Sequence, residues 1–164
     1  MPSSLKRFEA ITRALAQMPR REPATEPVAK TGALHPFDER NIHPDLPSNV
    51  RTLFDDGHFA QATFEAFKYL DKYVEKHSGL GESGYKLMMN AFAEGNPKLP
   101  LTPMKTASEK DEQQGYKFIF VGGVLAIRNP RGHEFSVVHD PDLCLDHLSF
   151  VSMLLRRLEQ AGYK

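Results

Sequence analysis

The stretch that decides the fold runs from His58 to His77 and reads HFAQATFEAFKYLDKYVEKH. Its apolar side chains recur at steps of three and four positions, and the expected buried face comprises Phe59, Ala62, Ala66, Leu70, Tyr73 and Val74. This spacing predicts a long amphipathic helix with one buried face. Gly57 before the stretch and Ser78-Gly79 after it predict its ends.

Shorter helices are predicted on both sides of this stretch. Ser48 is the expected N-cap of a helix that ends near Asp56. A second helix is expected over about 82–94, before Gly95-Asn96-Pro97. A third begins at Ser108, which forms an expected capping box with Asp111.

The third helix contains two adjacent glycines, Gly122 and Gly123, each costing about 1 kcal/mol in helix propensity relative to alanine. Two interpretations remain open: a neighbour that approaches the backbone closely, or a strand that ends there. The last helix has a clear start, with Asp140 as N-cap and Pro141 at its first position. Because no pair of alternating strands is found, the sequence predicts an all-α fold.

The N-terminal region is predicted to be separate from this bundle. Residues 1–18 carry apolar side chains at helical spacing and predict an accessory amphipathic helix. Three prolines interrupt residues 19–33, which predict a linker. The helical domain is expected over 34–164.

The composition restricts the function. The chain has 164 residues, with 21 basic and 21 acidic side chains. Zero net charge argues against nonspecific coating of nucleic acid, although it permits a small focused site. The longest apolar run, residues 118–127, is shorter than the roughly 20 residues that span a bilayer. The single cysteine, Cys144, fits a reducing compartment, so a cytoplasmic protein is expected.

The candidate chemistry lies in Arg128-Asn129-Pro130-Arg131-Gly132-His133. Pro130 disfavours a continuous helix, so we expect a bend after Ile127 that brings His133 beside Arg128. A histidine can exchange protons near neutral pH, and an arginine can stabilise a negatively charged phosphorus centre. This pair suits metal-independent RNA cleavage by the RNA's own 2′-hydroxyl, with Asn129 assisting. Arg131 adds a second cation for substrate binding.

The Arg-Asn-x3-His arrangement resembles the signature of the HEPN superfamily of small all-α ribonucleases and RNA- or nucleotide-binding domains. The chain as a whole is similar to the Ymh-type family of uncharacterised prokaryotic and phage proteins within that group. The resemblance covers about residues 34–160, and the matching stretches are 34–36, 54–62, 65–66, 84–88, 114–115, Gly122 and 127–130.

This resemblance implies a HEPN-like helical bundle and a homodimer, in which two motifs face each other across a cleft between subunits. It implies an endoribonuclease that needs no cofactor or metal, with Arg128 and His133 at the motif's invariant positions and Asn129 at its polar second position. Many relatives are toxins or abortive-infection effectors, so an RNA substrate and a cognate inhibitor or larger defence assembly are expected. The alternative is a non-catalytic helical module that binds a protein partner, RNA or a nucleotide.

Two further sets of residues are considered. Glu65 lies among apolar residues and is a candidate to hold a motif arginine, although a solvated helix face is the simpler explanation. A second set could suggest zinc but lacks a paired Cys-x2-Cys element: His139, Asp140, Cys144 and His147. Helix capping by Asp140 and core packing by Cys144 explain this set more simply, and no metal site is predicted.

Overall fold

A computed structural model describes residues 34–133 and 140–164, and of Gly132 and His133 it describes the backbone alone. These residues are mostly helical and include no strand, which confirms the all-α prediction. The predicted accessory helix at 1–18 and the linker at 19–33 lie outside the described residues. Leu34 begins a compact unit that extends to Lys164.

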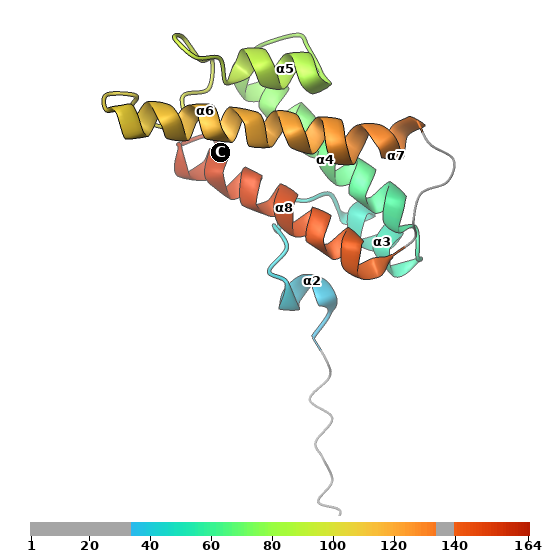
Figure 1. Ribbon diagram of the computed structural model, residues 1–164. Helices are drawn as coiled ribbons and strands as arrows, with labels where there is room; N and C mark the ends of the chain where they lie inside the picture. Colours follow the sequence, from blue (N-terminus) through green and yellow to red (C-terminus); the bar gives the residue numbers. More distant parts are fainter. Residues whose placement is uncertain (1–33, 134–139) are drawn as a thin grey trace, which may run out of the picture. The chain divides into compact units, whose positions relative to one another are not determined.

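The central helix of this unit is α4 (Phe59–Ser78), which packs against α3 (Ser48–Asp55), α5 (Gly84–Ala91) and α8 (Pro141–Gln160) (Figure 1). The apolar stripes of α4 and α8 face each other and form the centre of the core. Their fully buried members include Ala66, Phe67, Leu70, Val74, Leu148, Val151, Leu154 and Leu158. The predicted helix over 58–77 is therefore confirmed, and it ends at Gly79 in the left-handed conformation.

A long helical rod covers one side of this core. It consists of α6 (Ala107–Gly122), the π-helix η1 (Gly123–Arg128) and α7 (Asn129–His133), which follow one another without a break (Figure 1). The rod runs antiparallel to α8, since Arg157 donates to Glu112 near one end and Phe150 packs on Gly123 towards the other. A short helix, α2 (Pro36–Glu39), precedes α3.

The glycine pair is explained by two aromatic rings. A Cβ on Gly123 would lie 2.8 Å from Cε1 of Phe150 and 3.1 Å from Cε1 of Phe67, so any larger residue would require these rings to shift. The predicted close approach is therefore correct at Gly123, although side chains rather than a backbone make it. The alternative of a strand end is wrong, because the helix continues.

The helix starts are partly as predicted. Asp140 caps α8 by accepting hydrogen bonds from the backbone of Asp142 and Leu143, which confirms that prediction. The predicted capping box at Ser108 is wrong, since Thr106 and Glu109 form it instead. Glutamate reaches back to the N-cap backbone where the shorter aspartate does not.

Two other predicted boundaries shift by one or more residues. The N-cap position of α3 is held by Pro47, and Ser48 is the first helical residue. The helix expected over 82–94 is only α5, Gly84–Ala91.

The predicted bend after Ile127 is also wrong. Asn129 keeps helical angles and its N–H bonds to the carbonyl of Val124, five residues back. The i→i+5 pattern of a π-helix puts more residues into the turn before Pro130, which relieves the clash of its ring with the preceding turn. The guanidinium of Arg131 also donates to the carbonyl of Ile127 (2.9 Å). The proline is therefore accommodated within a continuous helical path.

Candidate functional site

Arg128 lies at the last position of the π-helix and turns towards the core. Its guanidinium carbon is 5.4 Å from the centroid of the Phe64 ring, a cation–π contact with α4. Its Nη1 donates to Oδ1 of Asn129 (3.2 Å) and lies 3.6 Å from the place where a Cβ on Gly84 would stand. Its Nε is buried and has no hydrogen-bond partner among the described residues. The buried Nε–H is therefore left unpaired within the described residues.

A buried carboxylate supports this arginine from α4. Asp71 is only 4% exposed, and its Oδ1 accepts a hydrogen bond from the N–H of Gly84 (2.7 Å). Burial raises the pKa of Asp71, while the Gly84 hydrogen bond and the charge of Arg128 oppose that rise. Gly84 has φ of 60°, which favours glycine, and a Cβ there would lie at van der Waals contact distance from Arg128. Three helices, α4, α5 and η1, thus meet at Asp71, Gly84 and Arg128.

Arg131 points to a different group of side chains. Burial lowers its pKa, and the nearby thiol of Cys144 opposes that effect. Burial and the charge of Arg131 also lower the pKa of His147 to about 4, and the Nδ1 of His147 is buried without a partner. The structure therefore brings Arg131 close to Cys144 and His147 on α8.

The other predicted site residues are only partly brought together. Asn129 accepts a hydrogen bond from Arg128, which suits the assisting role predicted for it. Glu65 does not hold the arginine: its ion-pair partner is Lys68 (3.3 Å), and it lines a shallow depression beside α3. The backbone of His133 ends α7, five positions after Arg128. Positions five apart on a helix lie about 140° apart around its axis, so no bend brings them together within one copy. The convergence of the two side chains stays a prediction.

The residues considered for zinc have other roles where the structure describes them. Cys144 accepts from the hydroxyl of Thr63 (3.5 Å) and donates to the carbonyl of Phe59 (3.3 Å). Asp140 caps its helix, and His139 lies outside the described residues. Core packing and capping thus account for this pair.

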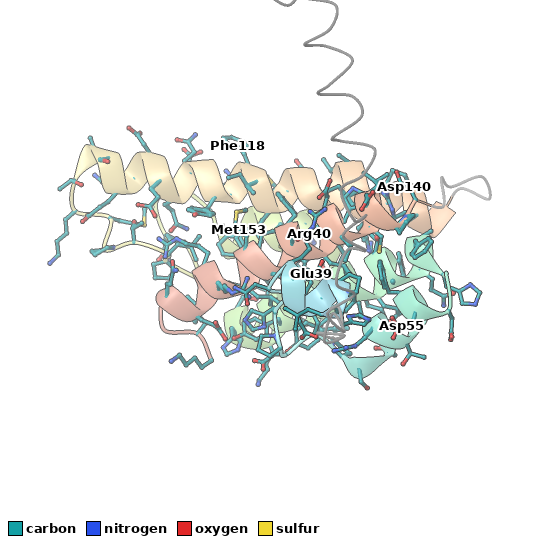
Figure 2. The ribbon with its side chains drawn as sticks, turned by 90° about the horizontal axis from the view of Figure 1, so that it is seen from below. Glu39, Arg40, Asp55, Phe118, Asp140 and Met153 are labelled. Carbon is teal, nitrogen blue, oxygen red and sulfur yellow. The ribbon has the colours of Figure 1, made fainter. Side chains whose placement is uncertain are left out.

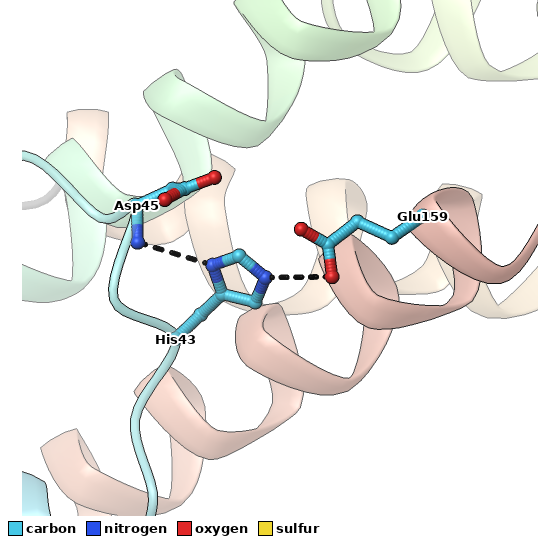
Figure 3. Close-up of side chains that lie close together, drawn as sticks. All are labelled: His43, Asp45 and Glu159. Carbon is cyan, nitrogen blue, oxygen red and sulfur yellow. Dashed lines mark hydrogen bonds and ion pairs between the residues drawn. The ribbon is translucent and has the colours of Figure 1, made fainter. Parts of the chain in front are cut away.

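A second cluster, His43 with Asp45 and Glu159, offers three potential metal ligands within 4.8 Å of one another (Figure 3). The hydrogen bonds of the buried His43 argue against a metal there. Its Nδ1 accepts from the backbone N–H of Asp45 (3.2 Å), so Nε2 carries the proton that points to Glu159 (3.2 Å). A metal on Nε2 would need a proton on Nδ1, where the Asp45 N–H already points. The cluster instead fastens the 43–45 turn to the end of α8.

Sequence reasoning missed Phe64 and Asp71. A signal for Asp71 was available, since a charged residue on the buried face of the helix over 58–77 needs a partner. The partner itself was not visible, because residues 71, 84 and 128 meet only through tertiary packing.

The whole arrangement is a half-buried, permanently charged guanidinium that lies over the Phe64 ring and donates to the side-chain amide of Asn129. Such a group can bind a phosphate or stabilise charge that develops on it. A family model described as "Protein of unknown function (Hypoth_ymh)" matches residues 40–158, and the chain belongs to this family. No curated protein and no solved structure matches the chain. Among the described residues, no helix is long and apolar enough to cross a membrane.

Proposed function

We propose that this protein is a metal-independent endoribonuclease whose site contains Arg128, Asn129 and His133. The observation that carries the proposal is the π-helix that ends on Arg128. Short π-helical turns are rare, and they are frequent at functional sites. In this chain the turn ends on the arginine that the sequence selects, and that arginine has a buried N–H without a partner.

The chemistry assigns a role to each residue. The 2′-oxygen of the RNA attacks the adjacent phosphorus, the bond to the 5′-oxygen breaks, and a 2′,3′-cyclic phosphate remains. His133 accepts the 2′-hydroxyl proton or donates a proton to the leaving oxygen. Arg128 stabilises the additional negative charge on the phosphorus centre, and Asn129 orients its guanidinium. Arg131 supplies further positive charge for the substrate.

The resemblance to the HEPN superfamily supports a biological role for such an activity. We propose a cytoplasmic toxin or anti-phage effector that acts as a homodimer and is restrained by a cognate inhibitor or a larger defence assembly.

A second candidate function has its own support. The contacts of Arg128 with Phe64 and with the charge of Asp71 also suit an arginine that merely joins helices. Under this alternative the protein is a helical module that binds a protein partner, RNA or a nucleotide without cleaving it.

RNA cleavage by variants separates the two functions. Wild-type protein is incubated with a mixed RNA pool in the presence of a metal chelator, beside His133→Ala and Arg128→Lys. His58→Ala serves as the control, since His58 is an exposed histidine outside the motif. We expect cyclic-phosphate ends from wild type and from the control, and a loss of at least 100-fold in His133→Ala, the typical contribution of a general acid or base. Equal cleavage by wild type and His133→Ala, with both folded, would exclude the proposal.

A further inference from the structure

Three large apolar side chains are left partly uncovered by the described residues along the border between α6 and α8. Met153 is 42% exposed, Ile119 is 38% exposed, and Phe150 is half-buried. We call these three residues the border surface. Exposed apolar side chains that lie together mark a place where another segment or molecule binds.

The border surface is continuous because the two helices run antiparallel there. Two contacts join the helices on either side of it: Phe150 with Gly123, and Arg157 with the ring of Tyr116 (5.1 Å). Met153 lies between the two contacts on α8, and Ile119 lies between them on α6. The two exposed side chains therefore stand at the same level of the paired helices.

The chain enters the helical unit on this same side of α8. Arg40, at the end of α2, pairs with Asp146 (2.7 Å), and the carbonyl of Asn41 accepts a hydrogen bond from Arg156. Asp146 lies two turns before Met153 on α8, and Arg156 lies one turn after it. Figure 2 views the molecule from this side, with Met153 and Arg40 labelled. The segment that precedes α2 is therefore attached close to the border surface.

Residues 1–33, which lie outside the described residues, include a segment that needs such a surface. In the helix predicted from the sequence, the apolar stripe comprises Leu5, Phe8, Ile11, Leu15 and Met18. An isolated helix of this length is marginally stable in water, so most of its stability must come from packing its apolar stripe against another element.

The length of the connecting chain permits the contact. Residues 19–33 can extend over roughly 50 Å at 3.3 Å per residue. Helix α8, with 20 residues, is only about 30 Å long. The segment can thus reach the whole border surface. A tether of this kind also holds the segment at an effective concentration of about 1 mM, which favours it over a free partner or a second copy.

Charge on this side of the molecule also favours a basic segment. The three arginines beside the border surface are already bonded within the described residues: Arg40 to Asp146, Arg156 to Asn41 and Arg157 to Glu112. Two exposed carboxylates there, Glu39 on α2 and Asp142 three turns before Met153, form no ion pair within the described residues. Residues 5–18 carry three basic side chains against one acidic side chain.

We propose that residues 5–18 pack as an amphipathic helix on the border surface of their own chain, with the apolar stripe against Ile119, Phe150 and Met153. The N-terminal segment then closes this side of the helical unit. The contact does not depend on ribonuclease activity, because it involves none of the residues assigned to the cleavage site.

Thiol labelling of the full chain tests the contact. Met153→Cys places a reporter thiol in the border surface, whereas the native Cys144 is 2% exposed and stays unlabelled. Burial of an isoleucine changes an equilibrium constant by about tenfold or more. Adding Ile11→Glu, which breaks the stripe, should therefore raise the labelling rate of Met153→Cys by about tenfold. Ala10→Glu is the matched control, because position 10 points away from the stripe in the predicted helix, and it should leave the rate unchanged.

A second reporter and the chain concentration separate the outcomes. Tyr85 is 49% exposed and lies on α5 outside the border surface, so Tyr85→Cys should react equally fast with and without Ile11→Glu, provided that the fold is intact. Protection of Met153→Cys that is independent of chain concentration supports packing within one chain. Protection that appears only at high concentration, as binding of a second copy requires, would overturn the proposal. So would equal labelling of Met153→Cys with and without Ile11→Glu, whatever the RNA cleavage assay shows.

Discussion

Replacing each of the two adjacent glycines by alanine should have different effects on stability. At Gly122 the new methyl group meets no atom within 4 Å, so the variant gains about 1 kcal/mol of helix propensity. At Gly123 the same gain is offset by overpacking, because the methyl carbon would lie 2.8 Å from Phe150 and 3.1 Å from Phe67. Overpacking in a core typically costs about 1–3 kcal/mol.

The difference between the two variants isolates the packing cost, since the propensity gain is common to both. Gly123→Ala should therefore be about 1–3 kcal/mol less stable than Gly122→Ala. For a chain of this length that corresponds to roughly 3–9 °C in the midpoint of thermal unfolding. Circular dichroism at low protein concentration measures the midpoint without a contribution from paired copies. Equal midpoints would refute the argument that Phe67 and Phe150 require a glycine at position 123.

Two further changes have defined outcomes. The pKa of His147 is lowered to about 4 in the folded protein, so the folded state binds fewer protons than the unfolded state between pH 4 and 6.5. The free energy of unfolding should then fall as the pH drops from 6.5 to 4. Thermal midpoints measured across that range should fall less in His147→Gln than in wild type. Equal falls in the two proteins would contradict the lowered pKa of His147. Thr106→Ala should lose about 1 kcal/mol of unfolding free energy in urea titrations, because it removes the N-cap of α6. Ser108→Ala, the control, should stay within about 0.5 kcal/mol of wild type, and equal losses would contradict the assigned capping box.

The candidate site depends on interactions between sequence neighbours and on interactions between residues far apart in the sequence. The motif at 128–133 is local, and the sequence was sufficient to select Arg128 and Asn129, which do contact each other. The direction of the guanidinium was not predictable in this way. One π-helical turn shifts the helical phase of every residue after it, and it thereby turns Arg128 towards Phe64 and Asp71. The same turn explains why the bend expected at Pro130 does not occur.

The sequence by itself determined the helical fold, because its signals act within one or two turns. The periodicity of 58–77 and the Asp140-Pro141 start of α8 predict their helices without reference to the rest of the chain. Tertiary structure alone decided where the π-helix lies and which residues surround Arg128. Alternatives such as an α or a π turn differ by little in local energy. Contacts between distant residues, such as the rings of Phe67 and Phe150 on Gly123, therefore decide between them.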